Sequence, residues 1–174
     1  MRKVLSILAV LSLTIPVVLA QTKTAAPAAA KMALDTGWKC GAPETPAAIP
    51  YPGQPDHSYS IYKITCTATK GTVNGVKEKS GMATEFADGT GASAHGHGIF
   101  METLENGDTI TYTYSFTGTM ANKMMQAGTN TWTMSSATGK MKGITGTGTC
   151  AAKGNPDGSA NFECKGTYAM GAAK

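Results

Sequence analysis

The sequence has no Cys-x-x-Cys pair, no Gly-x-Ser-x-Gly motif and no long apolar run after its first twenty residues. Without closely spaced cysteines, thioredoxin-like redox chemistry and zinc-ribbon folds have no support. Without the serine motif, and with no identifiable Ser or Asp partner for the histidines, a hydrolase is disfavoured. Without a later apolar run, the mature chain is expected to be soluble, with no membrane span.

Long runs of like charge are also missing. The formal net charge is +4, Arg2 and Lys3 lie at the extreme N-terminus, and the remaining lysines are scattered among Asp and Glu. This distribution argues against nucleic acid or an anionic membrane as the main partner. Paired catalytic carboxylates are not indicated either, because Glu102, Glu105 and Asp108 flank an expected turn, where solvated charge is ordinary.

What is present begins with an export signal. Arg2 and Lys3 precede an apolar run over residues 4–18, and the small residues of the sequence VLA at 18–20 suit cleavage after Ala20. The run is shorter than the roughly 20 residues that a membrane-spanning helix requires. We therefore expect residues 1–20 to be a signal peptide and the mature protein to be exported, either periplasmic or extracellular.

Two segments of low hydrophobic periodicity follow the signal peptide. Residues 21–36 are rich in Ala, Thr and Lys and indicate a flexible leader. Residues 41–57 hold five of the eight prolines, which remove backbone donors and favour extended, unpaired backbone. The sequence therefore predicts a flexible Ala- and Pro-rich leader and arm over residues 21–57, and a folded domain over residues 58–174.

From residue 58 onward, apolar positions recur with period two, which is the spacing of β-strands. In the clearest stretch, residues 109–119, the apolar positions alternate with Thr and Ser; they are Ile110, Tyr112, Tyr114 and Phe116. Turn-forming dipeptides separate such runs, so we predict an all-β domain, either a sandwich or a closed antiparallel barrel. We favour the barrel because Gly143, Gly146 and Gly148 fall within strand patterns, where glycine permits sharp curvature.

Three stretches of the C-terminal half carry a family resemblance: ENGDTITYTYSFTGTM, TNTWTMSSATGKMKGITGTGTC and FECKGTY. Over roughly residues 58–170, the chain resembles small secreted bacterial relatives of the allene oxide cyclase and dirigent barrels. The resemblance implies a single antiparallel barrel of about eight strands, whose interior in the plant members holds an apolar or phenolic ligand. It also implies self-association by analogy with the plant proteins. It assigns no catalytic residue in this chain.

A candidate ligand site follows from the Asn106-Gly107 dipeptide, which is typical of a two-residue hairpin turn. That turn sets a register in which His97 faces Phe116, so His95 and His97 share the inward face with the aromatic row. A shift of one residue would turn both imidazoles outward. The candidate ligand-binding residues are His95, His97, Tyr112, Tyr114, Phe116 and Trp132.

No metal or other cofactor is expected. His95 and His97 in a His-x-His pair supply only two ligands, which make an incomplete zinc or copper site. Met120, Met124 and Met125 crowd one loop, and flexible side chains that cap an open barrel end or pack loosely in a loop explain this arrangement better than a Cu(I) site.

Three functions fit the sequence. The leading one is an exported barrel, non-enzymatic or at most weakly catalytic, that encloses a small, mostly apolar or phenolic molecule. The second is an isomerase or cyclase of the allene oxide cyclase or dirigent type, in which His95 or His97 transfers protons. The third is an envelope structural or interaction protein whose barrel is packed and has no pocket.

Four cysteines follow the expected cleavage site, an even number that suits disulfides in an oxidising compartment. Cys150 and Cys164 are symmetric about Asp157 in a turn-forming segment, so a hairpin there places them directly opposite each other. We therefore predict a disulfide between Cys150 and Cys164. Cys40 is then left to pair with Cys66.

Overall fold

The structure is a computed structural model that describes residues 30–171. The expected signal peptide and the first part of the expected leader, residues 21–29, lie outside the described residues. Within residues 30–171 the chain forms ten β-strands and one short 3-10 turn. No helix in this part of the chain is long and apolar enough to cross a membrane.

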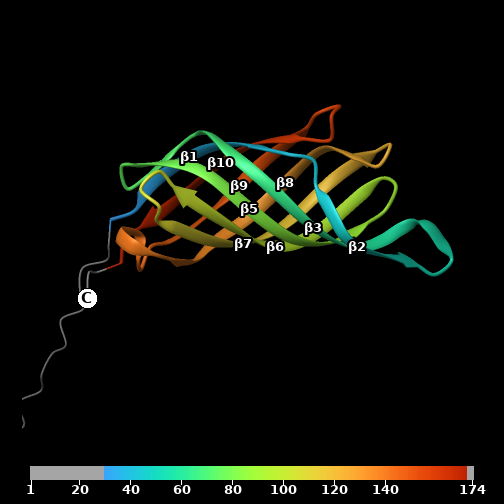
Figure 1. Cartoon of the computed structure of the whole chain (residues 1–174), viewed down its shortest axis with the longest axis horizontal. Coiled ribbons are helices and arrows are strands. Elements are labelled where there is room, and N and C mark those ends of the chain that lie inside the picture. Colours follow the sequence, from blue (N-terminus) through green and yellow to red (C-terminus); the bar gives the residue numbers. More distant parts are fainter. Residues whose placement is uncertain (1–29, 172–174) are drawn as a thin grey trace, which may run out of the picture.

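Ten strands follow one another along the chain: β1 (Met32–Cys40), β2 (Glu44–Tyr51), β3 (Gln54–Lys70), β4 (Thr72–Val73), β5 (Val76–Gly89), β6 (Ser93–Leu104), β7 (Thr109–Ala121), β8 (Met124–Ala137), β9 (Thr145–Gly154) and β10 (Ala160–Ala169). The 3-10 turn η1 (Gly139–Met141) lies between β8 and β9. Eight strands form a closed antiparallel barrel in the order β3-β1-β10-β9-β8-β7-β6-β5, because β3 pairs with both β1 and β5. Figure 1 shows this barrel, and it confirms the predicted fold class.

The N-terminal boundary of the barrel differs from the prediction. β1, which overlaps the expected flexible leader, lies between β3 and β10 and pairs antiparallel with both. It buries Leu34 and Trp38 in the barrel interior. The barrel therefore begins at residue 32 rather than at residue 58. The sequence does not show apolar alternation in β1, because one of its inward positions is the polar Thr36. The Thr36 hydroxyl donates a hydrogen bond to the buried Glu78.

The Pro-rich arm is a hairpin rather than unpaired backbone. β2 pairs with the first part of β3, and the two strands project beyond one end of the barrel (Figure 1). The prolines are compatible with this pairing because β2 is an edge strand, with a neighbour on one side only. The ladder is irregular after Glu44 and again after Pro50, as expected where backbone donors are missing.

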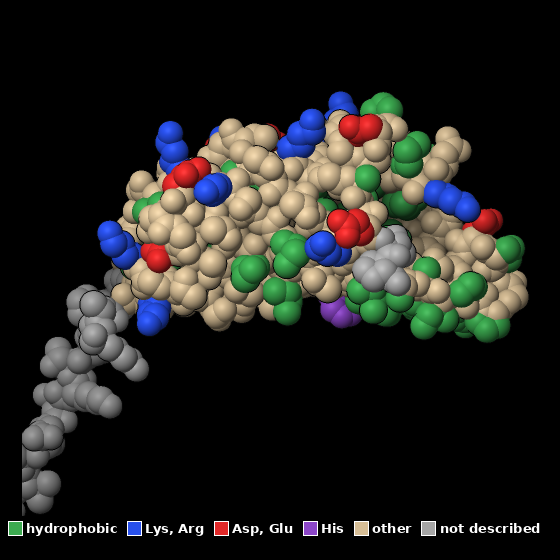
Figure 2. All heavy atoms as spheres, in the orientation of Figure 1, with side chains coloured by type: hydrophobic (Ala, Val, Ile, Leu, Met, Phe, Trp, Pro, Cys, Tyr) green, Lys and Arg blue, Asp and Glu red, His purple; other side chains and the backbone are tan. Residues whose placement is uncertain are grey.

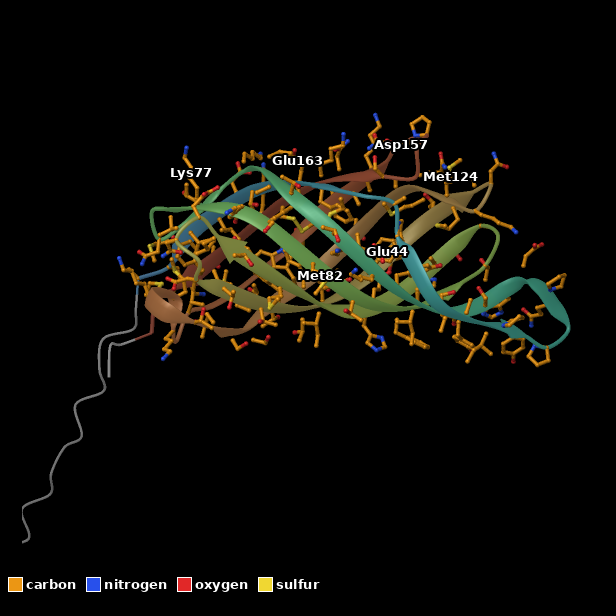
Figure 3. All side chains as sticks on the ribbon, in the orientation of Figure 1. Glu44, Lys77, Met82, Met124, Asp157 and Glu163 are labelled. Carbon is orange, nitrogen blue, oxygen red and sulfur yellow. A yellow bond between two sulfur atoms is a disulfide. The ribbon has the colours of Figure 1, made fainter. Side chains whose placement is uncertain are left out.

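The two ends of the barrel are built differently. One end is plugged by apolar side chains that are fully buried, namely Val73, Leu104, Ile110 and Met141. The other end holds the β7–β8 turn, where Met120, Met124 and Met125 line the opening of the interior. Figure 3 shows Lys77 and Met124 at these opposite ends. The methionines therefore lie at the open barrel end, which is one of the two arrangements expected from the sequence.

Aromatic rings lie against the barrel wall at positions where the wall is glycine. A Cβ atom added to Gly148 or Gly166 would lie 2.2 or 2.6 Å from ring atoms of Trp132. A Cβ atom added to Gly128 would lie 2.6 Å from the Phe116 ring. Because these rings use the space that side chains of the wall would otherwise fill, they leave part of the barrel centre unfilled.

Both predicted disulfides are present in the structure. Cys150 and Cys164 oppose each other on β9 and β10 in the predicted register, with their Cα atoms 3.9 Å apart. Cys40 and Cys66 oppose each other on β1 and β3, with a Cα separation of 4.0 Å. All four side chains are buried and line the barrel interior. Each disulfide therefore links two adjacent strands from inside the barrel.

Removing the second disulfide with the double substitution Cys150→Ala and Cys164→Ala should lower the free energy of unfolding by about 3 kcal/mol, because the unfolded chain gains entropy when the crosslink is lost. Urea unfolding of the oxidised protein measures this change. The matched control is Thr149→Ala with Lys165→Ala, the adjacent opposed pair on the outer face, which should change stability by about 0.5 kcal/mol or less. Non-reducing peptide mapping that links Cys150 to Cys40 would contradict the strand register.

Candidate functional site

The barrel interior contains a cavity of about 350 Å³. All eight barrel strands contribute to its lining, which is mainly apolar and aromatic; its large apolar residues include Leu34, Trp38, Ile64, Phe100, Phe116 and Phe162. Small-molecule sites have volumes of about 300–1,000 Å³. The cavity is therefore large enough for one small molecule.

Four of the predicted ligand-binding residues line this cavity: Tyr112, Tyr114, Phe116 and Trp132. Each is between 6 % and 9 % exposed, and three of them lie on β7, as the period-two pattern predicts. Tyr112 and Trp132 pack edge to face, with ring centroids 5.5 Å apart. The Tyr112 and Trp132 rings therefore hold each other in place in the wall of the cavity.

The two predicted histidines lie on the outer face instead. His95 opposes Thr117 and His97 opposes Ser115, one residue away from the predicted register, and both imidazoles are exposed. The prediction that they face the interior is therefore wrong. Neither histidine can serve as an acid–base group inside the barrel.

The length of the β6–β7 loop explains the difference. Leu104 N–H donates to the Asp108 carbonyl oxygen at 2.9 Å, so three residues, not two, separate the paired positions. Gly107 takes the left-handed conformation, with φ of 86°, and donates back to the Leu104 carbonyl. A turn followed by a left-handed glycine is the other common short hairpin loop, and one additional residue reverses the faces of β6.

The same reversal brings a carboxyl group into the barrel. Glu102, which was expected to flank a turn and be solvated, is 0 % exposed. Glu78 and Glu85 on β5 are buried as well, at 7 % and 8 % exposure. All three line the cavity. They are the polar residues of the site that sequence reasoning missed, because their direction depends on the β6 register and on pairing between distant strands.

Each buried carboxyl accepts a hydrogen bond from a hydroxyl group on another strand. The Tyr112 hydroxyl donates to Glu102 Oε2 at 2.6 Å, and the Tyr114 hydroxyl donates to Glu85 Oε2 at 2.9 Å. The Thr36 hydroxyl donates to Glu78 Oε2. Among the described residues that line the cavity, the single Lys or Arg is Lys123, in the β7–β8 turn at the open end.

Burial shifts the protonation of these carboxyls. It raises the pKa of Glu78 to about 8, helped by the negative charge of Glu102 and opposed by the hydrogen bond from Thr36. It raises the pKa of Glu102 to about 7, against the hydrogen bond from Tyr112. Burial also raises the pKa of Glu85. The cavity therefore holds carboxyl groups that gain and lose protons near neutral pH.

Four buried polar atoms of the cavity lining have no hydrogen-bond partner within residues 30–171: Glu78 Oε1, Glu102 Oε1, Asn130 Oδ1 and Trp132 Nε1. Buried polar atoms are normally paired, since leaving one unpaired costs about 1–3 kcal/mol. These atoms are available to the polar groups of a ligand. No cluster of three or more His, Cys, Asp or Glu residues suited to a metal ion occurs in the same part of the chain.

A second feature is a shallow hollow across the outside of the barrel, lined by Phe86, His97, Ile99 and several threonines. Exposed apolar side chains surround it, with Ile99 at 53 % and Ile61 at 43 % exposure. Figure 2 shows hydrophobic side chains gathered along one side of this outer surface. None of the unpaired buried polar atoms belongs to an outward-facing side chain, so the interior is the stronger candidate site.

Comparison with known proteins supports the fold alone. No family model and no curated protein matches the chain. One similar solved structure is a protein of unknown function from the DUF3224 family of Shewanella oneidensis MR-1. It aligns with a TM-score of 0.51 and 13 % identity, over 83 % of this chain and 100 % of that one. This structural likeness gives no evidence about the activity of the chain. The resemblance to allene oxide cyclase or dirigent proteins remains an expectation from the sequence.

The buried carboxyls predict that stability falls as the pH rises from about 5 to about 8. Their pKa values in the folded protein lie above the ordinary value of 4.5, so over this range the folded chain keeps protons that the unfolded chain has released. Each retained proton lowers the free energy of unfolding by up to about 1.4 kcal/mol per pH unit. Urea unfolding at several pH values measures the slope.

The double substitution Glu78→Gln and Glu102→Gln should reduce this pH dependence, because an amide does not titrate, and leave the contribution of Glu85. Glu105→Gln is the matched control, since Glu105 is exposed beside the same strand and should leave the slope unchanged. A slope that survives intact in the double variant would show that other groups cause it.

Proposed function

We propose that this protein is an exported binding protein that encloses one small, mostly apolar or phenolic molecule inside its barrel. The observation that carries the proposal is the 350 Å³ interior cavity, lined by aromatic rings and by buried polar atoms without partners. The rings offer flat apolar surface to a ligand, and the polar atoms offer a small number of fixed points that orient it.

Stability considerations disfavour a purely structural role. A cavity in a protein core lowers stability roughly in proportion to its volume, and unpaired polar atoms lower it further. In a barrel with a purely structural role, apolar side chains in place of Glu78 and Glu102 would remove the cost of their unpaired carboxyl oxygens. Their presence inside the barrel is better explained by a ligand that contacts them.

An isomerase or cyclase of the type implied by the family resemblance is the second candidate. His95 and His97 do not support it, because they lie outside the barrel. The favourable observation is the hydrogen-bonded pair of Tyr112 and Glu102, since a carboxyl group with a pKa of about 7 suits general acid–base catalysis. A bound compound recovered unchanged supports the binding protein. A compound converted to an isomer, with conversion lost in Glu102→Gln, supports the enzyme.

Binding in the cavity is testable with an uncharged naphthalene dye. The two tryptophans of the chain, Trp38 and Trp132, both line the cavity, so energy transfer from tryptophan to the dye detects binding. Because Trp132 also lines the outer hollow, substitutions on the two faces are needed to locate the dye. We expect saturable transfer at one dye per chain. Ala83→Phe should weaken binding by about tenfold or more, because Ala83 points into the cavity and the added ring fills it.

The matched control is Thr84→Phe, which adds the same ring at the next residue, on the outer face. It should leave the affinity for the dye unchanged. Near-ultraviolet circular dichroism checks that each variant is folded, and Ala94→Leu supplies a smaller cavity-filling change at another inward position. Binding that is lost in Thr84→Phe but kept in folded Ala83→Phe would assign the dye to the outer hollow and overturn the proposal.

A further inference from the structure

The plugged end of the cavity contains a pair of interacting carboxyl groups, Glu78 on β5 and Glu102 on β6. Glu78 opposes Leu104, one of the fully buried residues of the plug, across the β5–β6 ladder. Glu102 lies two residues before Leu104 on the same inward face. We refer to Glu78 and Glu102 as the carboxyl pair.

Each member of the carboxyl pair has one oxygen engaged and one free. The Thr36 and Tyr112 hydroxyl groups donate to the two Oε2 atoms, and both Oε1 atoms are buried without a partner. Asn130 on β8 adds a third unpartnered acceptor to the lining. The cavity therefore has acceptors available to a ligand that brings hydrogen-bond donors.

Trp132 is an independent indication of a ligand. It comes from a different strand, it is only 6 % exposed, and its Nε1 has no partner although the residue lines the cavity. Its ring and that of Tyr112 pack edge to face at 5.5 Å in the same cavity. Indole and phenol rings bind both apolar groups and organic cations, the latter through cation–π contacts.

The charges around the carboxyl pair favour a positive ligand group. The hydroxyl groups of Thr36 on β1 and Tyr112 on β7 face the pair, and Glu85 with Tyr114 lies further along the same cavity. Among the described lining residues, the one cationic side chain is Lys123, at the opposite, open end. Once the pair releases a proton, its negative charge has no counter-ion within the lining.

We propose that the molecule bound in the barrel is an apolar amine, whose protonated nitrogen donates to Glu78 Oε1 and Glu102 Oε1 while its hydrocarbon body packs on the aromatic wall. This inference rests on the proposed function and names the class of ligand. A charge-assisted hydrogen bond to a carboxylate is stronger than a neutral one, and the buried site excludes the water that would compete with it.

Protonation of the carboxyl pair couples this binding to pH. Burial gives Glu78 a pKa of about 8 and Glu102 a pKa of about 7, so the pair loses protons as the pH rises from about 6 to about 9. An alkyl amine with a pKa of about 10 stays charged over the same range. Affinity for the amine therefore rises with pH, whereas affinity for an uncharged compound of the same shape does not.

Three naphthalene compounds of matched size provide the test: naphthylethylamine, naphthylethanol and naphthylpropionate. Their affinities are measured by displacement of the uncharged dye at a pH of about 8. We expect the amine to bind about tenfold more tightly than the alcohol, and the carboxylate to bind least tightly. The advantage of the amine over the alcohol should shrink at a pH of about 6.

In the double variant Glu78→Gln and Glu102→Gln the amine should bind no more tightly than naphthylethanol, and the single variant Glu78→Gln provides a milder change. Glu105→Gln, outside the barrel, should keep the preference. If the alcohol binds as tightly as the amine, or if the preference survives in the folded double variant, the inference is wrong and the proposed function stands. If none of the three compounds binds the folded protein, both fail.

Discussion

The pairing of β3 with β5 closes the sheet, and the rest of the structure depends on that closure. Ten consecutive residue pairs, from Ser58 with Gly89 to Thr67 with Ser80, join the two strands. β3 is long enough to pair with β2 and β5 along its first part and with β1 along its last part. In a closed barrel, alternate side chains of each strand point inward and outward. The inward side chains therefore line the cavity, and the outward ones face solvent.

The filling of the interior follows from the residues that closure turns inward. Large rings are matched by glycines in the wall, as where Trp132 lies against Gly148 and Gly166, so bulky side chains lie at the periphery. The two disulfides fix neighbouring strands from inside and occupy part of the same volume. The result is one contiguous apolar core that still encloses a small cavity.

Within that wall, the carboxyl groups link three properties of the protein. Burial makes ionised Glu78 and Glu102 costly to the folded state, so protonation, stability and the affinity for a cationic ligand all change together. Tyr112 and Thr36 hold one oxygen of each carboxyl and leave the other free. A ligand that donates to the free oxygens would offset the cost of burying them, which connects the chemistry of the site to its energetics.

The sequence by itself determined the features that rest on local patterns. Period two over residues 109–119 places Tyr112, Tyr114 and Phe116 on one face whatever their neighbours are, and the symmetry of Cys150 and Cys164 about one turn sets their pairing. Only the tertiary structure decided the rest. The Asn106-Gly107 dipeptide is compatible with loops of two or three residues, and the hydrogen bonding between Leu104 and Asp108 selects three, which turns the histidines outward and Glu102 inward. The strand β1 joins partners far away in sequence, so its nine residues alone could not reveal a place in the barrel.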